Sequence, residues 1–260
     1  MEVAGVNEIA WTAPWLAPFA DIAHDVSPAG DWRFALNRTA RLRKVSTAGG
    51  LPLLFDGPDA ARGEAYEAFI ARSGRVPTRA NLHDFFNALA WLRYPRSKAR
   101  LNELQAAAIA RAGVGATRGP LRDAATLIDE NAVLLMTERT DLVDALRHHD
   151  WTRLFWEERN AWNGQITVLA FGHALLEKLV RPYKAITAHA LHVALPITAD
   201  AGQVDAAAAM LLDDRLSPRR LLPLPVLGIP GWSAANADPS FYSDTAVFRP
   251  AAPARQPDMR

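Results

Sequence analysis

Two histidine–carboxylate groups in this sequence have the residue types and the spacing of a metal site. The first lies in an Asn-x-His-Asp-x-x-Asn stretch at residues 81–87. The second is a His-x-x-x-Glu pair directly after a predicted strand and a glycine, and one helical turn brings its two side chains together. Imidazole and carboxylate groups suit zinc, manganese and related divalent ions. We therefore predict that a divalent metal, Zn or Mn, is held by His83, Asp84, His173 and Glu177.

Each of these groups also fits a purely structural role. A histidine at a helix edge that hydrogen-bonds a neighbouring turn would give the pattern around His83. Glu177 could equally be a surface residue beside Lys178, and its spacing lacks the further residues that make His-Glu-x-x-His diagnostic. In this alternative the histidines and acids form a buried polar network that fixes the packing of helices and strands.

Three consecutive polar residues, Asp129-Glu130-Asn131, stand between two apolar runs. Such a cluster usually forms a turn, so we predict a turn at this position. A carboxylate there that faced the histidines would have the chemistry of a general acid or base. We therefore predict Glu130 as the catalytic acid/base.

Charges are unevenly distributed along the middle of the chain. Residues 93–122 carry seven Lys or Arg residues and one acid, whereas residues 123–150 carry seven acids and two arginines. Two solvated faces that pair with each other would explain this pattern. Alternatively, guanidinium groups beside the free N–H groups of a helix start at Gly119–Pro120 suit a phosphate or a carboxylate. On this hypothesis an anionic small molecule binds Arg118, Arg122 and Lys184.

The elements that must position these side chains follow from apolar periodicity and from helix-stop residues. Residues 78–112 predict two consecutive helices, because Pro95 lacks an N–H and its ring clashes with a continuous helix. A short helix then ends near Leu127. The later predicted elements are strands at 133–136, 166–170 and 185–195, and helices at 173–181 and 202–215.

Together these elements predict a helix-dominated α+β fold with a small sheet, formed by residues 1–260 as a single domain. Residues 1–60 show little helical periodicity and are predicted to wrap around the core at 61–215. The Pro-rich residues 216–260 are predicted to form an extended arm that lies on the domain.

The composition excludes several classes of chemistry. The sequence contains no cysteine, which removes disulfides, thiol catalysis and Cys-based zinc sites. With 29 Lys and Arg against 28 Asp and Glu, no strong field favours nucleic acid or a membrane as partner. The start of the sequence lacks a basic signal-peptide region, and no apolar stretch predicts a membrane span. We therefore expect a cytoplasmic protein, and no pattern indicates its oligomeric state.

Several stretches of the chain resemble a known family. They are NLHDFFNALAWLRYPRSKARLNELQ (81–105), RGPLRDAATLIDEN (118–131), FGHALLEKL (171–179), PYKAITAHAL (182–191), LPLPVLGIPGW (222–232) and FYSDTAVFRP (241–250). They resemble the uncharacterised bacterial family catalogued as domain of unknown function 3025. Because that family has no established activity, the resemblance implies none here.

The function predicted from the residues is therefore metal-assisted hydrolysis of a phosphate-containing or other anionic substrate. The first alternative is a non-catalytic binding or scaffold protein built on a buried His/Asp/Glu network. The second is a metal-free enzyme that uses a His–carboxylate pair.

Overall fold

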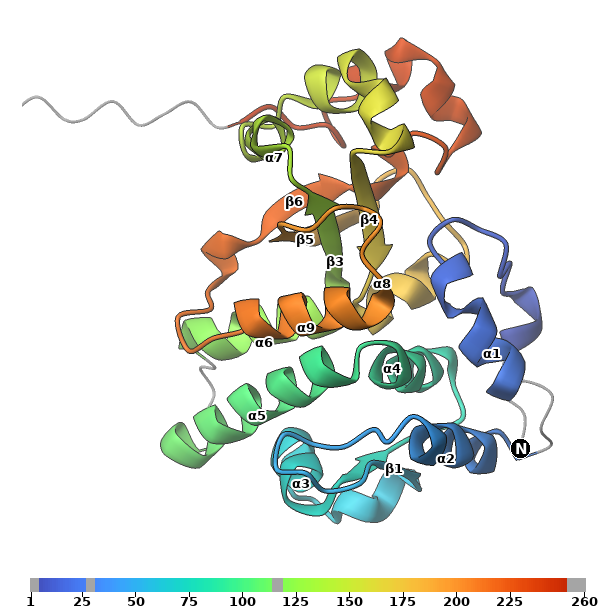
Figure 1. Cartoon of the computed structure of the whole chain (residues 1–260), viewed down its shortest axis with the longest axis vertical. Helices are drawn as coiled ribbons and strands as arrows, with labels where there is room; N and C mark the ends of the chain where they lie inside the picture. Colours follow the sequence, from blue (N-terminus) through green and yellow to red (C-terminus); the bar gives the residue numbers. More distant parts are fainter. Residues whose placement is uncertain (1–4, 27–30, 114–118, 252–260) are drawn as a thin grey trace, which may run out of the picture.

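The chain folds with stacked layers of helices on one side of a small β-sheet, and with α7 (Thr140–Arg147) and short helical turns on the other side (Figure 1). The structure is a computed structural model, and it describes residues 5–26, 31–113 and 119–251. The helices that separate the N-terminal part from the sheet form two adjacent layers (Figure 1). They are α4 (Leu82–Arg93) and α5 (Pro95–Ala112) in one layer, and α6 (Gly119–Asn131), α8 (His173–Lys178) and α9 (Ala201–Leu211) in the next. This confirms the predicted α+β class.

The larger sheet has four strands and follows the apolar runs of the sequence. Their order is β4 (Ile166–Ala170), β3 (Ala132–Thr137), β5 (Thr187–Val193) and β6 (Leu222–Pro225). The central pair β3–β5 is parallel, whereas β4 and β6 pair antiparallel to their neighbours. All six residues of β3 are buried, as expected for a strand covered on both faces.

The predicted break at Pro95 is confirmed. The α4 helix begins after Asn81, whose side chain accepts the Asp84 N–H at 2.8 Å, and it ends at Arg93. Pro95 is the first residue of α5, where its missing N–H leaves no intrahelical hydrogen bond unmade. The two helices therefore follow each other with only Tyr94 between them.

The predicted turn at 129–131 is wrong. The α6 helix runs through Asn131, and β3 begins at the next residue without a loop. The Ala132 carbonyl accepts the N–H groups of Phe171 and Gly172, so pairing with a distant segment, rather than a local turn, ends the helix. Asp129 and Glu130 consequently lie on the last turn of α6.

The N-terminal part contains more helix than its periodicity predicts. Asp31 accepts two N–H groups at the start of an amphipathic helix, and this cap was not anticipated. Described elements of this part are α1 (Ala20–Val26), α2 (Trp32–Leu42), β1 (Leu54–Asp56), α3 (Tyr66–Ser73) and β2 (Arg75–Pro77). The strands β1 and β2 form a separate parallel pair.

The Pro-rich C-terminal part contains more regular structure than the extended arm that was predicted to lie on the domain. Its β6 strand completes the sheet, and short 3₁₀ turns follow that strand in the chain. The α7 helix (Thr140–Arg147), from earlier in the sequence, packs beside β6. The Trp151 indole N–H donates to the Arg249 carbonyl at 2.7 Å and ties this segment to the domain. Across the described residues, every helix is too short or too polar to cross a membrane.

Candidate metal centre

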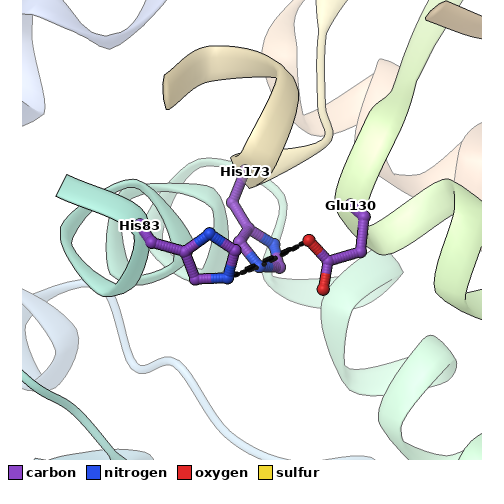
Figure 2. Close-up of side chains that lie close together, drawn as sticks. All are labelled: His83, Glu130 and His173. Atoms are coloured by element: carbon purple, nitrogen blue, oxygen red, sulfur yellow. Dashed lines mark hydrogen bonds and ion pairs between the residues drawn. The ribbon is translucent and has the colours of Figure 1, made fainter. Parts of the chain in front are cut away.

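Three side chains from three different helices converge at one point between α4, α6 and α8. They are His83, Glu130 and His173 (Figure 2). The two imidazole Nε2 atoms are 3.0 Å apart, and Glu130 Oε2 lies 3.4 Å from His173 Nε2 and 3.9 Å from His83 Nε2. One potential ligand atom from each residue lies within 4.8 Å of the other two.

These separations are close to those of ligand atoms in a coordination sphere. Metal–ligand bonds of about 2.0–2.2 Å in a tetrahedral site place neighbouring ligand atoms roughly 3.3–3.6 Å apart. Of the three distances, 3.4 Å lies within this range, 3.0 Å lies just below it and 3.9 Å lies just above it. Without an ion, two Nε2 atoms at 3.0 Å require that one ring carries an Nε2–H and donates a hydrogen bond to the unprotonated Nε2 of the other. With an ion, both lone pairs can point at the same centre.

A close approach at Gly172 sets the position of His173. A Cβ atom at Gly172 would lie 2.4 Å from the Asn131 nitrogen and 2.5 Å from the Glu130 carbonyl oxygen. Only glycine therefore allows the start of α8 to contact the end of α6 so closely. His173 is the first residue of α8, so this contact brings its ring next to the Glu130 side chain.

A carboxylate faces the far side of each imidazole ring. Glu177 Oε2 lies 3.0 Å from His83 Nδ1, so a proton on Nδ1 leaves Nε2 free as a ligand atom. Asp129 Oδ2 lies 3.8 Å from His173 Nδ1, which is buried and has no hydrogen-bond partner among the described residues. Glu177 was predicted as a metal ligand, but it contacts the His83 ring and does not join the three converging side chains.

A polar network of side chains extends from Asp129, beside the candidate centre, through Lys98. The Lys98 ammonium contacts Asp129 Oδ1 and donates to Asn87 Oδ1 at 2.7 Å, and Asn87 Nδ2 donates to the Tyr66 hydroxyl at 3.0 Å. Burial by itself would raise the pKa of Asp129, but Lys98 and His173 together hold it below its ordinary value. Sequence reasoning missed Lys98, which it grouped with surface arginines.

The electrostatics of the site act in opposite ways on two of the candidate ligands, keeping the His173 ring neutral and disfavouring the charged form of Glu130. Burial lowers the pKa of His173 to about 4, so the ring is neutral at physiological pH. Burial, followed by the nearby charge of Asp129, raises the pKa of Glu130. A cation at this point would relieve that repulsion between the two carboxylates.

Asp84 does not join the three converging residues. Both of its carboxylate oxygens contact Arg79: Oδ2 accepts the Arg79 backbone N–H at 2.6 Å and its Nε–H at 3.1 Å. Asp84 is 7% exposed, and this pairing with Arg79 compensates its buried charge. Its described contacts indicate a role in holding the entry to α4.

Two of the three predicted anion-binding residues, Arg122 and Lys184, lie away from the centre. Lys184 pairs with Asp244 at 3.0 Å and lies over the Phe241 ring. Arg122 is on the first turns of α6, about 12 Å along the helix axis from Glu130. Arg118 lies outside the described residues. The arginine flank predicted for the metal site is therefore not assembled there by the residues that the structure describes.

A pocket of about 460 Å³ opens onto the candidate centre. Within the described parts of the chain, Arg79 is the one cationic side chain in its lining, against the five carboxylates Asp59, Glu67, Asp84, Asp129 and Glu130. Burial, followed by the charge of Asp129, raises the pKa of Glu67 to about 7, although Asn102 Nδ2 donates to its Oε2 at 2.6 Å. Sequence reasoning also missed Glu67.

The raised pKa of Glu67 predicts a specific effect of pH on stability. Between about pH 4.5 and 7 the folded chain holds a proton on Glu67 that the unfolded chain has released. The contribution of this proton to the free energy of unfolding is therefore largest at low pH and declines as pH rises toward 7. In urea titrations, Glu67→Gln should gain about 1–2 kcal/mol relative to wild type between pH 5 and 8. Parallel pH profiles for the two proteins would contradict the raised pKa.

The fold and the site define an α+β domain with a candidate His–Glu–His centre in an acidic pocket. The chain belongs to the family described as protein of unknown function (DUF3025), which it matches over residues 56–252. All three converging side chains lie within the matched range, and the resemblance noted in the sequence is confirmed. Searches of curated proteins and of solved structures gave no match.

Proposed function

We propose that this protein is a metal-dependent hydrolase. The observation that carries the proposal is the convergence of His83, Glu130 and His173 from three helices in the lining of a pocket. Two histidines and one glutamate are a donor set used by catalytic zinc sites, which leave a further coordination position for water or substrate. A divalent ion bound there supplies Lewis-acid and water-activating chemistry.

The chain's own residues have separate roles in this proposal. His83, His173 and Glu130 hold the ion, and Glu177 fixes the orientation of the His83 ring through its 3.0 Å contact with Nδ1. With Glu130 serving as a ligand, a different group must move protons. We assign that role to Glu67, because it lines the same pocket and its pKa of about 7 suits an acid/base at neutral pH.

The charges around the pocket bear on the substrate. Arg79 is 64% exposed at its side chain and is paired with Asp84, so the lining offers little attraction to a multiply charged anion. We therefore place an uncharged ester or amide ahead of the phosphate-containing substrate that the sequence suggested. A panel of chromogenic carboxyl esters, amides, phosphomonoesters and phosphodiesters would rank these classes.

The test of the metal centre is elemental analysis followed by calorimetric titration with Zn²⁺ and Mn²⁺. Wild type should bind about one ion, whereas His173→Ala should lose at least tenfold in affinity, as expected when a ligand is removed. His192→Ala is the matched control, because His192 is half-buried and, within the described part of the chain, its ring hydrogen-bonds only the Thr137 carbonyl. That variant should bind the ion like wild type.

The scaffold alternative is favoured by one observation, the continuous network from Tyr66 through Asn87 and Lys98 to Asp129. In that case neither ion should give a heat of binding, and His173→Ala should only lower the melting temperature. The metal-free alternative rests on the His83–Glu177 pair. It predicts hydrolysis that persists in EDTA and disappears in Glu177→Gln.

A further inference from the structure

A second pocket, of about 720 Å³, lies between the end of α2, the junction of α4 with α5, and the start of α9. It shares no lining residue with the pocket at the candidate metal centre. Its charged lining consists of five cationic side chains and one carboxylate. They are Arg43, Lys44, Arg93, Arg96, Arg100 and Asp205. Its volume is in the range of sites for small organic ligands.

The one carboxylate is already engaged by the backbone. Asp205 is 3% exposed, and its two oxygens accept the N–H groups of Arg96 and Ser97 at 2.9 Å each. These are unpaired donors at the start of α5, where a negative charge also interacts favourably with the helix dipole. Asp205 therefore stabilises the helix start and leaves the cationic side chains of the pocket largely uncompensated.

Three of the five cations have no acidic partner in the described chain. Arg43 pairs with Asp21 at 3.3 Å, and Arg100 pairs with Glu103 at 2.6 Å. Among the residues described, no carboxylate oxygen lies within 4.0 Å of the charged nitrogens of Lys44, Arg93 or Arg96. The Nε of Arg93 is also buried without a hydrogen-bond partner in this part of the chain.

The backbone at Lys44 supports a functional interpretation of this charge. Lys44 follows the C-terminal end of α2 with a φ of 53°, in the left-handed region that glycine adopts most easily after a helix. This conformation disfavours a side chain with a Cβ atom. The chain nevertheless carries a lysine there, which adds an ammonium group to the pocket.

We propose that this pocket binds a small molecule that carries two or more phosphate groups. Arg93 and Arg96 present guanidinium groups, whose paired N–H donors match phosphate oxygens, and Lys44 adds a third positive charge. Leu92 and Ala99 lie in the same lining and offer apolar contact to the organic part of the ligand. The inference does not depend on the proposed hydrolase activity.

The experiment is calorimetric titration of the full chain with inorganic tripolyphosphate in buffer containing EDTA. Wild type should bind with an affinity that falls as salt rises. The double variant Arg93→Gln/Arg96→Gln should bind at least about tenfold more weakly, because charge-assisted hydrogen bonds are lost. Arg219→Gln, which alters an exposed arginine outside the pocket, and His173→Ala should both bind like wild type.

A thermal unfolding transition checks that the double variant is folded. If the double variant does not fold, the single variant Arg96→Gln, at an exposed residue, is titrated in its place. No binding by wild type, or equal binding by wild type and the pocket variants, would overturn the proposal. Loss of binding in His173→Ala would move the phosphate to the metal centre. Tighter binding of a 20-base-pair duplex DNA that depends on the same arginines would replace the small molecule by nucleic acid.

Discussion

Replacing Lys98 by methionine should lower the free energy of unfolding by about 3–5 kcal/mol, the range for a buried ion pair that loses one partner. The side chains of Lys98 and Asp129 are only 4% and 13% exposed, and Lys98 also donates to Asn87. Methionine fills a similar volume, so the loss comes from leaving the Asp129 charge without its partner. Urea denaturation at pH 7 measures the effect.

A second change separates the charge effect from packing. Lys98→Met combined with Asp129→Asn removes both charges and should recover at least half of the lost stability, since no unpaired buried ion remains. Lys178→Met, at an exposed lysine, should stay within about 0.5 kcal/mol of wild type. If the double variant is no more stable than Lys98→Met alone, the ion pair is not what stabilises this region.

Gly172→Ala should destabilise the protein by about 3 kcal/mol, toward the upper end of the usual cost of overpacking. The φ of Gly172 is −64°, so alanine meets no conformational barrier there. The cost comes from the backbone of Glu130 and Asn131, which would lie within 2.5 Å of the new Cβ. Separating α6 from α8 should also weaken metal binding, because Glu130 and His173 would no longer converge.

Gly57→Ala is the matched control for this prediction. Its φ of −62° is equally ordinary, but no atom lies within 4 Å of the position that a Cβ would occupy. That variant should keep wild-type stability within about 0.5 kcal/mol. Equal stability of the two alanine variants would show that the contact between α6 and α8 yields easily.

The elements most accurately predicted are those governed by local chemistry. Pro95 breaks the helix because of its own ring, and the buried strand β3 follows from its continuous apolar run. The Asp-Glu-Asn stretch at 129–131 misled the prediction because turn propensity is local. The end of α6 is instead set by distant partners, including Thr187, whose carbonyl accepts the Asn131 Nδ2–H at 2.9 Å.

The candidate site was predictable only in its residue types. The sequence indicated that His83 and His173 could share an ion, but it could not show that Gly172 brings Glu130 beside them. It also placed Arg118 and Arg122 beside the histidines, but Arg122 lies elsewhere on α6. Two other arginines of the basic segment, Arg93 and Arg96, gather with Lys44, from a segment about 50 residues earlier, because α2 ends where α5 begins. No local signal marks such a contact.

The three converging side chains belong to two layers of the molecule. His83 lies on α4, which packs with the N-terminal helices, whereas Glu130 and His173 lie on helices next to the sheet. Anything that binds all three therefore ties one layer to the other, like a removable cross-link between segments far apart in the chain. Binding at the centre and packing of the two layers against each other are then thermodynamically coupled, so that each stabilises the other. Susceptibility to proteases along the boundary becomes a direct readout of what the centre holds.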